Sequence, residues 1–120
     1  MSVIIYHNPR CSKSRKSLEL LEQNRIQPEI VEYLNTPPDA ETLKKLLAKL
    51  GISARALLRT KEADYQAAGL DDPNLNDDDI IAAMIKCPKL IERPIVVMGN
   101  RAVIGRPPER VLELLGQSHV

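Results

Sequence analysis

The sequence predicts one α/β domain: a mixed four-stranded sheet flanked by helices and interrupted by a helical insertion. Three observations lead to this prediction. The 120-residue chain has the length of a single domain. Its apolar residues recur at strand-like spacing near both ends and at helix-like spacing in the middle. Proline-rich breaks separate a βαβ half from a closing ββα half. We therefore expect one domain over residues 1–120, with the insertion at about residues 39–87.

The first half is expected to form a strand, a helix and a second strand. A β-branched run at residues 3–6 ends at an Asn-Pro turn signal. Leucines on one face then predict a helix over residues 12–24. The alternating stretch at residues 29–33 predicts a second strand. The two strands should be parallel, because a helical crossover connects them.

The insertion is expected to be helical. Leucines spaced three and four apart mark one face of a helix that Asp39 caps and Gly51 ends. Asn76, followed by aspartates at 77–79, predicts another helix start, because a capping side chain and carboxylates complement the positive end of the helix dipole. The acidic run lacks the glycine and closing glutamate of a calcium loop, so we interpret it as a helix cap.

The last third is expected to form a hairpin and a helix. Two apolar runs, residues 91–98 and 101–105, are joined by Gly-Asn. Prolines then begin a final helix that ends at Gly116. The order βαβ, helices, ββα is that of a thioredoxin-like fold with a helical insertion. By analogy with that fold, Pro94 is a candidate for a cis-proline beside a reactive cysteine.

Composition narrows the classes of function. The formal charge is +1, so no global field favours nucleic acid or an anionic membrane. There is no basic-apolar leader and no apolar run near about 18 residues, so neither secretion nor membrane insertion is expected. Two cysteines far apart in sequence suit a reducing cytoplasm better than a disulfide framework. We expect a cytoplasmic protein that binds neither nucleic acid nor membrane.

Cys11 is the expected centre of the chemistry. It lies where the first strand gives way to the first helix, so unpaired amides and the positive end of the helix dipole should face its sulfur. Arg10, Lys13, Arg15 and Lys16 add positive charge nearby. Such surroundings lower the pKa of a thiol by about one to several pH units. The alternative is that Cys11 is a small buried hydrophobe, but its charged and hydroxylic neighbours favour a nucleophile.

The neighbours of Cys11 also exclude two thiol mechanisms. Ser14 stands where a dithiol oxidoreductase has its second cysteine. Ser17 stands where a phosphatase-type Cys-x5-Arg cradle has its arginine. A single-thiol chemistry is therefore expected. Cys87 is the rival thiol: it is either a small helix-end residue or an internal resolving partner, which would need the two Cα atoms within about 7 Å.

Four short motifs follow one another along the chain. They are Ile-Tyr-His-Asn-Pro-x-Cys-x-x-Ser-Arg at residues 5–15, Gly-Ile-Ser-Ala-Arg-Ala-Leu-Leu-Arg at 51–59, Glu-Arg-Pro-Ile-Val-Val at 92–97 and Ile-Gly-Arg-Pro at 104–107. With these motifs in this order, the chain resembles the glutaredoxin-coupled arsenate reductase family over nearly its whole length. Ser12 and Lys13 depart from the smaller Gly-Thr often found after the cysteine, which affects the expected docking of a thiol partner.

The resemblance implies an arsenate reductase with a cysteine nucleophile. The cysteine attacks arsenate, and three arginines bind the oxyanion. A histidine, which we interpret as an imidazolium, lowers the pKa of the thiol, and a serine hydroxyl is placed to hydrogen-bond the thiolate. The matching residues here are Cys11, Arg59, Arg93, Arg106, His7 and Ser14. Arg55 and Arg101 are expected to be solvated surface charges.

The resemblance also implies the partners. The family takes electrons from glutathione and a glutaredoxin, so glutathione is the expected co-substrate and no bound cofactor or metal is expected. The side-chain chemistry agrees, because arginine binds dianionic oxyanions such as arsenate in a bidentate way. Two alternatives stay open. One is a redox-responsive interaction protein of the Spx type, which generally has a Cys-x-x-Cys pair and lacks the full arginine set. The other is a thiol enzyme acting on a different oxyanion or on glutathione adducts.

Overall fold

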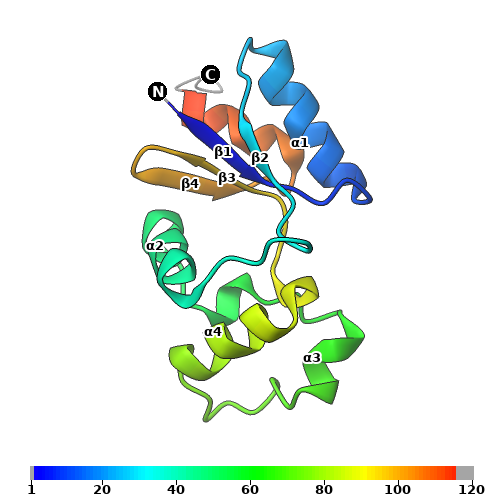
Figure 1. Cartoon of the computed structure of the whole chain (residues 1–120), viewed down its shortest axis with the longest axis vertical. Coiled ribbons are helices and arrows are strands. Elements are labelled where there is room, and N and C mark those ends of the chain that lie inside the picture. The colour runs from blue at the N-terminus through cyan, green and yellow to red at the C-terminus, as the bar shows by residue number, and fades with distance from the viewer. Residues whose placement is uncertain (1, 116–120) are drawn as a thin grey trace. The chain divides into compact units, whose positions relative to one another are not determined.

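A computed structural model describes residues 2–115 and contains a mixed four-stranded sheet in the order β2-β1-β3-β4. The strands are β1 (Val3–Tyr6), β2 (Glu29–Val31), β3 (Ile95–Met98) and β4 (Arg101–Ile104) (Figure 1). Strand β1 is parallel to β2 and antiparallel to β3, and β3 is antiparallel to β4. The predicted mixed sheet, with its βαβ and ββα halves, is confirmed.

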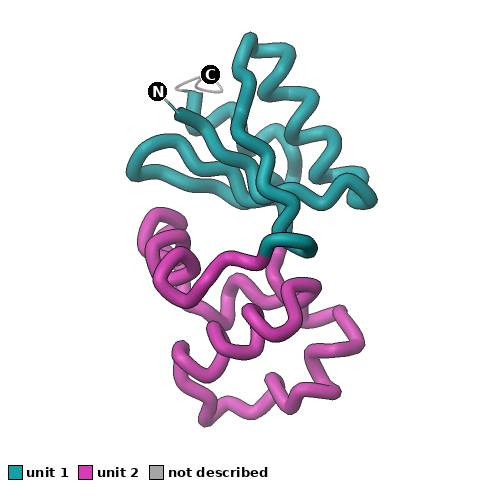
Figure 2. The backbone as a smooth tube through the Cα atoms, viewed as in Figure 1, with its two compact units in different colours: residues 1–36, 93–120 teal, residues 37–92 magenta. Residues whose placement is uncertain are grey.

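The chain divides into two compact units, coloured separately in Figure 2. Unit 1 comprises residues 1–36 and 93–120, and unit 2 comprises residues 37–92. The sheet lies in unit 1, and the expected insertion at about residues 39–87 falls within unit 2.

Two helices accompany the sheet in unit 1. Helix α1 (Ser12–Gln23) begins directly after Cys11, close to its predicted bounds. The final element, η3 (Pro108–Leu115), is a 3₁₀ helix, and its predicted end at Gly116 lies outside the described residues. Strand β2 ends before the predicted Tyr33, because turn hydrogen bonds to the Glu32 carbonyl begin there.

The core of unit 1 forms where α1 and η3 cover one face of the sheet. Ile5 of β1 lies opposite Val96 of β3, which in turn lies opposite Val103 of β4, so three side chains form a row across the strands. The buried cluster consists of Val3, Ile5, Leu21, Val96, Val103, Val111 and Leu114. Burial of this aliphatic cluster holds α1, and hence Cys11 at its start, against the sheet.

Unit 2 is helical. Its elements are α2 (Ala40–Leu50), η1 (Arg55–Leu57), α3 (Ala63–Ala67), α4 (Asp77–Lys86) and η2 (Pro88–Leu90). Both predicted caps are confirmed. The Asp39 carboxylate accepts a hydrogen bond from the Thr42 amide at 2.8 Å. Asn76 and Asp79 form a reciprocal capping box at the start of α4. Gly51 ends α2 with a φ of 69°, a conformation that glycine adopts without steric cost.

Two X-Pro peptide bonds are cis, Arg93–Pro94 and Arg106–Pro107. The first is the bond expected from the fold analogy, and the second is an addition to it. None of the helices in residues 2–115 combines the length and the apolar character that a bilayer-spanning segment requires.

Candidate active site

Cys11 occupies the N-cap position of α1. Its backbone is extended (φ −95°, ψ 124°), and its carbonyl accepts the first helical hydrogen bond, from the Arg15 amide at 3.0 Å. The Cys11 amide donates to the Asn8 carbonyl at 3.0 Å, which closes the turn after β1. The side chain is partly exposed. The sulfur therefore lies at the helix start, where free amides stabilise negative charge.

The pKa of the Cys11 thiol lies below its ordinary value. Burial is the largest single influence and raises it, but four groups together outweigh burial. They are the backbone amide of Ser14, the guanidinium of Arg93, the backbone amide of Lys13 and the guanidinium of Arg106. Amides and guanidiniums thus act on the sulfur together, and both favour the thiolate.

The shape of the sheet explains why two arginines reach this end of α1. Tyr6, at the end of β1, lies opposite Ile95 at the start of β3, and Ile95 lies opposite Ile104 at the end of β4. Arg93 precedes the start of β3 and Arg106 follows the end of β4. Both arginines therefore lie at the end of the sheet where β1 leads into the loop with Cys11. The Arg106 Nη1 group donates to the Arg93 carbonyl at 3.3 Å, which links the two segments.

Ser14 is buried and connects the first turn of α1 to the loop before it. Its Oγ lies 2.6 Å from Nδ1 of His7 and accepts a hydrogen bond from the Asn8 amide at 3.0 Å. The family resemblance implies a bond from this hydroxyl to the thiolate. The backbone amide of Ser14 acts on the Cys11 sulfur and lowers the pKa of the thiol, while the hydroxyl contacts His7 and the Asn8 amide.

His7 differs from the expectation of an imidazolium. It is buried, and burial is the main reason that its pKa lies below the ordinary value; the Arg15 guanidinium acts in the same direction, and the Glu32 carboxylate opposes them. The ring is consequently neutral at pH 7. The neutral ring adds no positive charge beside the thiol, and its Nδ1 contacts Ser14 in the first turn of α1.

Arg59, the third arginine of the predicted set, belongs to unit 2. It follows η1, and its amide donates to the Leu90 carbonyl at 2.8 Å. Its Nη1 group donates to the Lys89 carbonyl at 3.2 Å and lies 3.4 Å from the Glu62 carboxylate. The guanidinium is therefore held by partners within unit 2. Unit 1 brings together the other five predicted site residues.

Arg55 is not the solvated surface charge that the sequence suggests. Its Nη1 and Nη2 groups donate to the carbonyls of Leu70 and Asp72, each at 2.8 Å. These bonds tie η1 to the segment before α4, so Arg55 has a structural task. Arg101 is exposed, as expected, although its Nη2 group donates to the Glu113 carbonyl at 3.0 Å.

Cys87, the second thiol, lies in unit 2 at the end of α4. Its Sγ donates to Oδ2 of Asp64 at 3.5 Å. Burial, followed by the hydrogen bond to and the charge of Asp64, raises the pKa of this thiol above its ordinary value. The environment of Cys87 thus opposes the thiolate, in contrast to that of Cys11.

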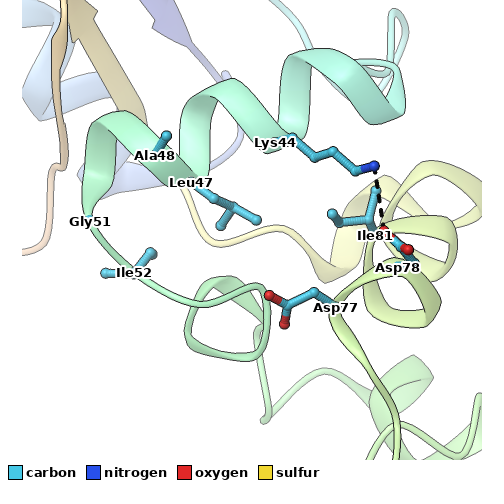
Figure 3. Close-up of a pocket in the computed structure, with 8 residues that line it drawn as sticks. All are labelled: Lys44, Leu47, Ala48, Gly51, Ile52, Asp77, Asp78 and Ile81. Carbon is cyan, nitrogen blue, oxygen red and sulfur yellow. Dashed lines mark ion pairs between the residues drawn. The ribbon is translucent and has the colours of Figure 1, made fainter.

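Two pockets are candidate places for the thiol chemistry. One, of about 500 Å³, lies between α2 and α4 in unit 2 (Figure 3). Its lining is Lys44, Leu47, Ala48, Gly51, Ile52, Asp77, Asp78 and Ile81, without a thiol, histidine or arginine. The other, of about 330 Å³, adjoins the loop before Cys11 in unit 1, and is lined by His7, Asn8, Pro9, Arg10, Glu32, Leu34 and Asn35. We place the thiol chemistry in unit 1, because the perturbed sulfur and its cations lie there.

Sequence reasoning missed Asn8 as a site residue. The Asn8 amide donates a hydrogen bond to Ser14 Oγ, and the Asn8 carbonyl accepts one from the Cys11 amide. The side-chain Oδ1 of Asn8 accepts a third from the Arg10 amide at 3.0 Å. The Asn-Pro turn signal was available but indicated only a turn. Within residues 2–115 no cluster of three or more His, Cys, Asp or Glu side chains is arranged to hold a metal ion.

Comparison with known proteins gives consistent matches over nearly the whole chain. A sequence model of the ArsC family matches residues 6–114. An arsenate reductase of Neisseria meningitidis is 49% identical over 112 residues, covering 92% of this chain and 96% of the relative. The uncharacterized protein YfgD of Escherichia coli K12 is 56% identical over 115 residues, covering 95% and 97%. The solved structure of an arsenate reductase from Vibrio cholerae is 54% identical and superposes with a TM-score of 0.92, covering 94% of this chain and 97% of that one.

Proposed function

The chain belongs to the ArsC family, and on that premise we propose that it is an arsenate reductase that uses Cys11 as its nucleophile. One observation carries the proposal. Amides of the first turn of α1 and the guanidiniums of Arg93 and Arg106 act on the same sulfur and lower its pKa. Donors that stabilise a thiolate here also suit a bound tetrahedral oxyanion.

The first chemical step is attack by the Cys11 thiolate on arsenic. A sulfur–arsenic bond forms, and an arsenate oxygen leaves as water after taking up protons. Negative charge develops on the remaining oxygens, where the forked, permanently charged guanidiniums of Arg93 and Arg106 stabilise it. Arginine suits this step better than lysine, because its planar donors match two oxygens at once.

The second step needs a thiol from solution. A glutathione thiolate joins the Cys11 sulfur as a mixed disulfide, and arsenic leaves with two electrons as arsenite. Glutaredoxin then removes the glutathione by thiol–disulfide exchange and restores Cys11. Cys87 is unsuited to this task, because burial and Asp64 keep it as the unreactive thiol. Chemistry of this kind belongs in a reducing compartment, which supports a cytoplasmic location.

Arg59 is the third proposed oxyanion ligand, on the strength of the family motif at residues 51–59. The Lys89 carbonyl and the Glu62 carboxylate hold its guanidinium. A guanidinium fixed in this way loses less side-chain freedom on binding an anion than a mobile one does. We therefore expect Arg59 to contribute to arsenate binding as well as to turnover.

A coupled assay tests the proposal. The native protein is mixed with arsenate, glutathione, glutaredoxin, glutathione reductase and NADPH, and NADPH oxidation is followed. We expect oxidation that depends on arsenate, on glutathione and on this protein, and that Cys11→Ser abolishes. Turnover with another oxyanion but not with arsenate would favour the alternative thiol enzyme. No turnover with any oxyanion, from folded protein with a reactive Cys11, would overturn the proposal.

A further inference from the structure

Ser17 lies on the buried face of α1, but neither the nucleophile nor the arginine cluster includes it. The buried residues of this helix are Ser14, Ser17 and Leu21, so Ser17 continues the line that starts at Cys11 and faces the sheet. Its side chain is fully buried, and among the described residues its hydroxyl has no hydrogen-bond partner. A buried hydroxyl without a partner costs free energy relative to alanine. That a serine is nevertheless found at position 17 suggests that the space filled by its hydroxyl matters.

Gly105 is the residue that Ser17 touches. It follows β4 directly and is buried. A Cβ atom at this position would overlap Ser17 Oγ, and would lie 2.9 Å from Pro94 Cγ and 3.3 Å from Ser17 Cβ. Its φ lies outside the positive range that favours glycine. Glycine is therefore required here by space alone, because α1 approaches the end of β4 so closely.

Ser17 and Pro94 both border the space where a Cβ of Gly105 would lie, and Gly105 and Pro94 are each one peptide bond from a site arginine. Pro94 follows Arg93, and Gly105 precedes Arg106. The Gly105 amide donates to the Pro94 carbonyl at 2.9 Å, so these two backbones form one surface against the helix. Any shift of α1 away from this surface would also move Cys11 away from both guanidiniums.

We propose that Ser17 is a positioning residue, which acts through Gly105 and Pro94 to set the separation between the Cys11 sulfur and the guanidiniums of Arg93 and Arg106. It does not touch the substrate. A larger group in this contact moves the helix outward and weakens the action of both guanidiniums on the sulfur. The expected effect on arsenate reduction rests on the proposed function. The expected effect on the pKa of Cys11 does not, because it depends only on the distance between the sulfur and the two guanidiniums.

Gly105→Ala tests this contact directly. The added Cβ must push Ser17 away, so we expect the pKa of Cys11 to rise by about half a pH unit or more. We also expect kcat/KM for arsenate to fall by about tenfold. In Ser17→Ala/Gly105→Ala the Oγ overlap is gone, and most of both effects should be reversed. Ser17→Ala alone removes the Oγ atom that keeps α1 at this distance, so the pKa of Cys11 should shift in the opposite direction, by a smaller amount than in Gly105→Ala.

A matched control separates positioning from simple loss of stability. Leu43→Ala removes a fully buried side chain of unit 2, whereas Ser17, Gly105 and Pro94 all belong to unit 1, so it should lower Tm but leave the pKa of Cys11 unchanged. If Gly105→Ala does not fold, Ser17→Thr crowds the same contact from the helix side, and should likewise raise the pKa.

Two outcomes overturn the positioning role. One is a pKa of Cys11 that stays at the native value in Gly105→Ala, or in Ser17→Thr if Gly105→Ala does not fold. The other is a double variant that recovers none of the shift. The pKa is read from thiolate absorbance without arsenate, so this result is independent of activity. If the variants show the expected pKa pattern but the native protein reduces no arsenate, the proposed function is refuted and the positioning role is still supported.

Discussion

Nδ1 of His7 lies 2.6 Å from Oγ of Ser14, and the same oxygen accepts the Asn8 amide at 3.0 Å. The pair joins the end of β1 to the first turn of α1 across the loop that carries Cys11. Because burial disfavours the charged form of the imidazole, we propose that the pair acts by holding the Ser14 amide in place beside the sulfur. Whether Nδ1 donates or accepts depends on the tautomer of the ring, and either arrangement keeps the contact.

A comparison of two His7 variants distinguishes position from charge. His7→Ala removes the contact with Ser14, so the first turn should loosen and the pKa of Cys11 should rise. His7→Asn supplies an amide near the place of Nδ1 and should retain most of the native value. Thiolate absorbance against pH gives both numbers. An equal rise in the two variants would mean that the imidazole ring itself is needed.

His7 should also make stability depend on pH. Its folded pKa is lowered, and its unfolded value is about 6.5. The unfolded chain therefore binds this proton more readily, so the contribution to stability is complete above about pH 6.5 and is lost as the pH falls through the folded pKa. Urea unfolding of the native protein and of His7→Asn, compared from pH 7 to pH 5, should show a steeper loss for the native protein. Parallel curves would contradict this linkage.

The three proposed site arginines should each matter far more for turnover than a surface arginine does. Arg59→Ala, Arg93→Ala and Arg106→Ala should each lower arsenate turnover by about tenfold or more, since each removes a charged donor from the developing oxyanion. The coupled assay measures the loss. Arg93→Lys should recover little, because lysine keeps the charge but lacks the fork.

Arg101→Ala is the matched control for the arginine series. Its side chain is exposed and donates to a backbone carbonyl, so its loss should change turnover less than twofold. Arg55→Ala is a poor control, because the Arg55 guanidinium holds two carbonyls within unit 2. Equal losses in the four variants Arg59→Ala, Arg93→Ala, Arg106→Ala and Arg101→Ala would indicate a general effect of positive charge.

The two thiols should behave oppositely. Cys11→Ser should abolish reduction, whereas Cys87→Ser should retain most of it and still require glutathione. Mass spectrometry of the native protein treated with arsenate and glutathione should find one glutathione on Cys11. Accumulation of an internal Cys11–Cys87 disulfide, with an inactive Cys87→Ser, would mean that the chain resolves the adduct with its own thiol.

The capping box of α4 should stabilise unit 2 measurably. Asn76→Ala removes the side chain that accepts the Asp79 amide at 2.9 Å, and should lower the free energy of unfolding by about 1 kcal/mol. Asn74→Ala is the control, because that exposed asparagine takes part only through its backbone. Thermal unfolding of both variants gives the comparison, and identical Tm values would show that the cap is dispensable.

Local signals predicted much of this structure. The β-branched run, the Asn-Pro turn and the leucine spacing place Cys11 at the start of α1, because each depends only on residues close in sequence. The caps at Asp39 and Asn76 are equally local. The end of β2 was missed, because a turn competes with strand pairing there.

Contacts made through space could not be predicted. Burial makes His7 neutral, and burial depends on how the chain packs around the ring. Arg55 looks like any surface arginine until the carbonyls of Leu70 and Asp72 meet it. The closeness of Gly105 to Ser17 likewise follows from how α1 packs on the sheet. The proposed site roles therefore rest on the family motifs and on this packing together.

Unit 1 is assembled from both ends of the chain, and this fixes when its chemistry can begin during synthesis. Cys11 leaves the ribosome early, but Arg93 and Arg106 are made only after unit 2 is complete. A nascent chain therefore carries Cys11 without the two guanidiniums that help to lower the pKa of its thiol until Arg106 has been translated. Truncated or prematurely terminated products should consequently be inert toward oxyanions and slow to react with electrophiles.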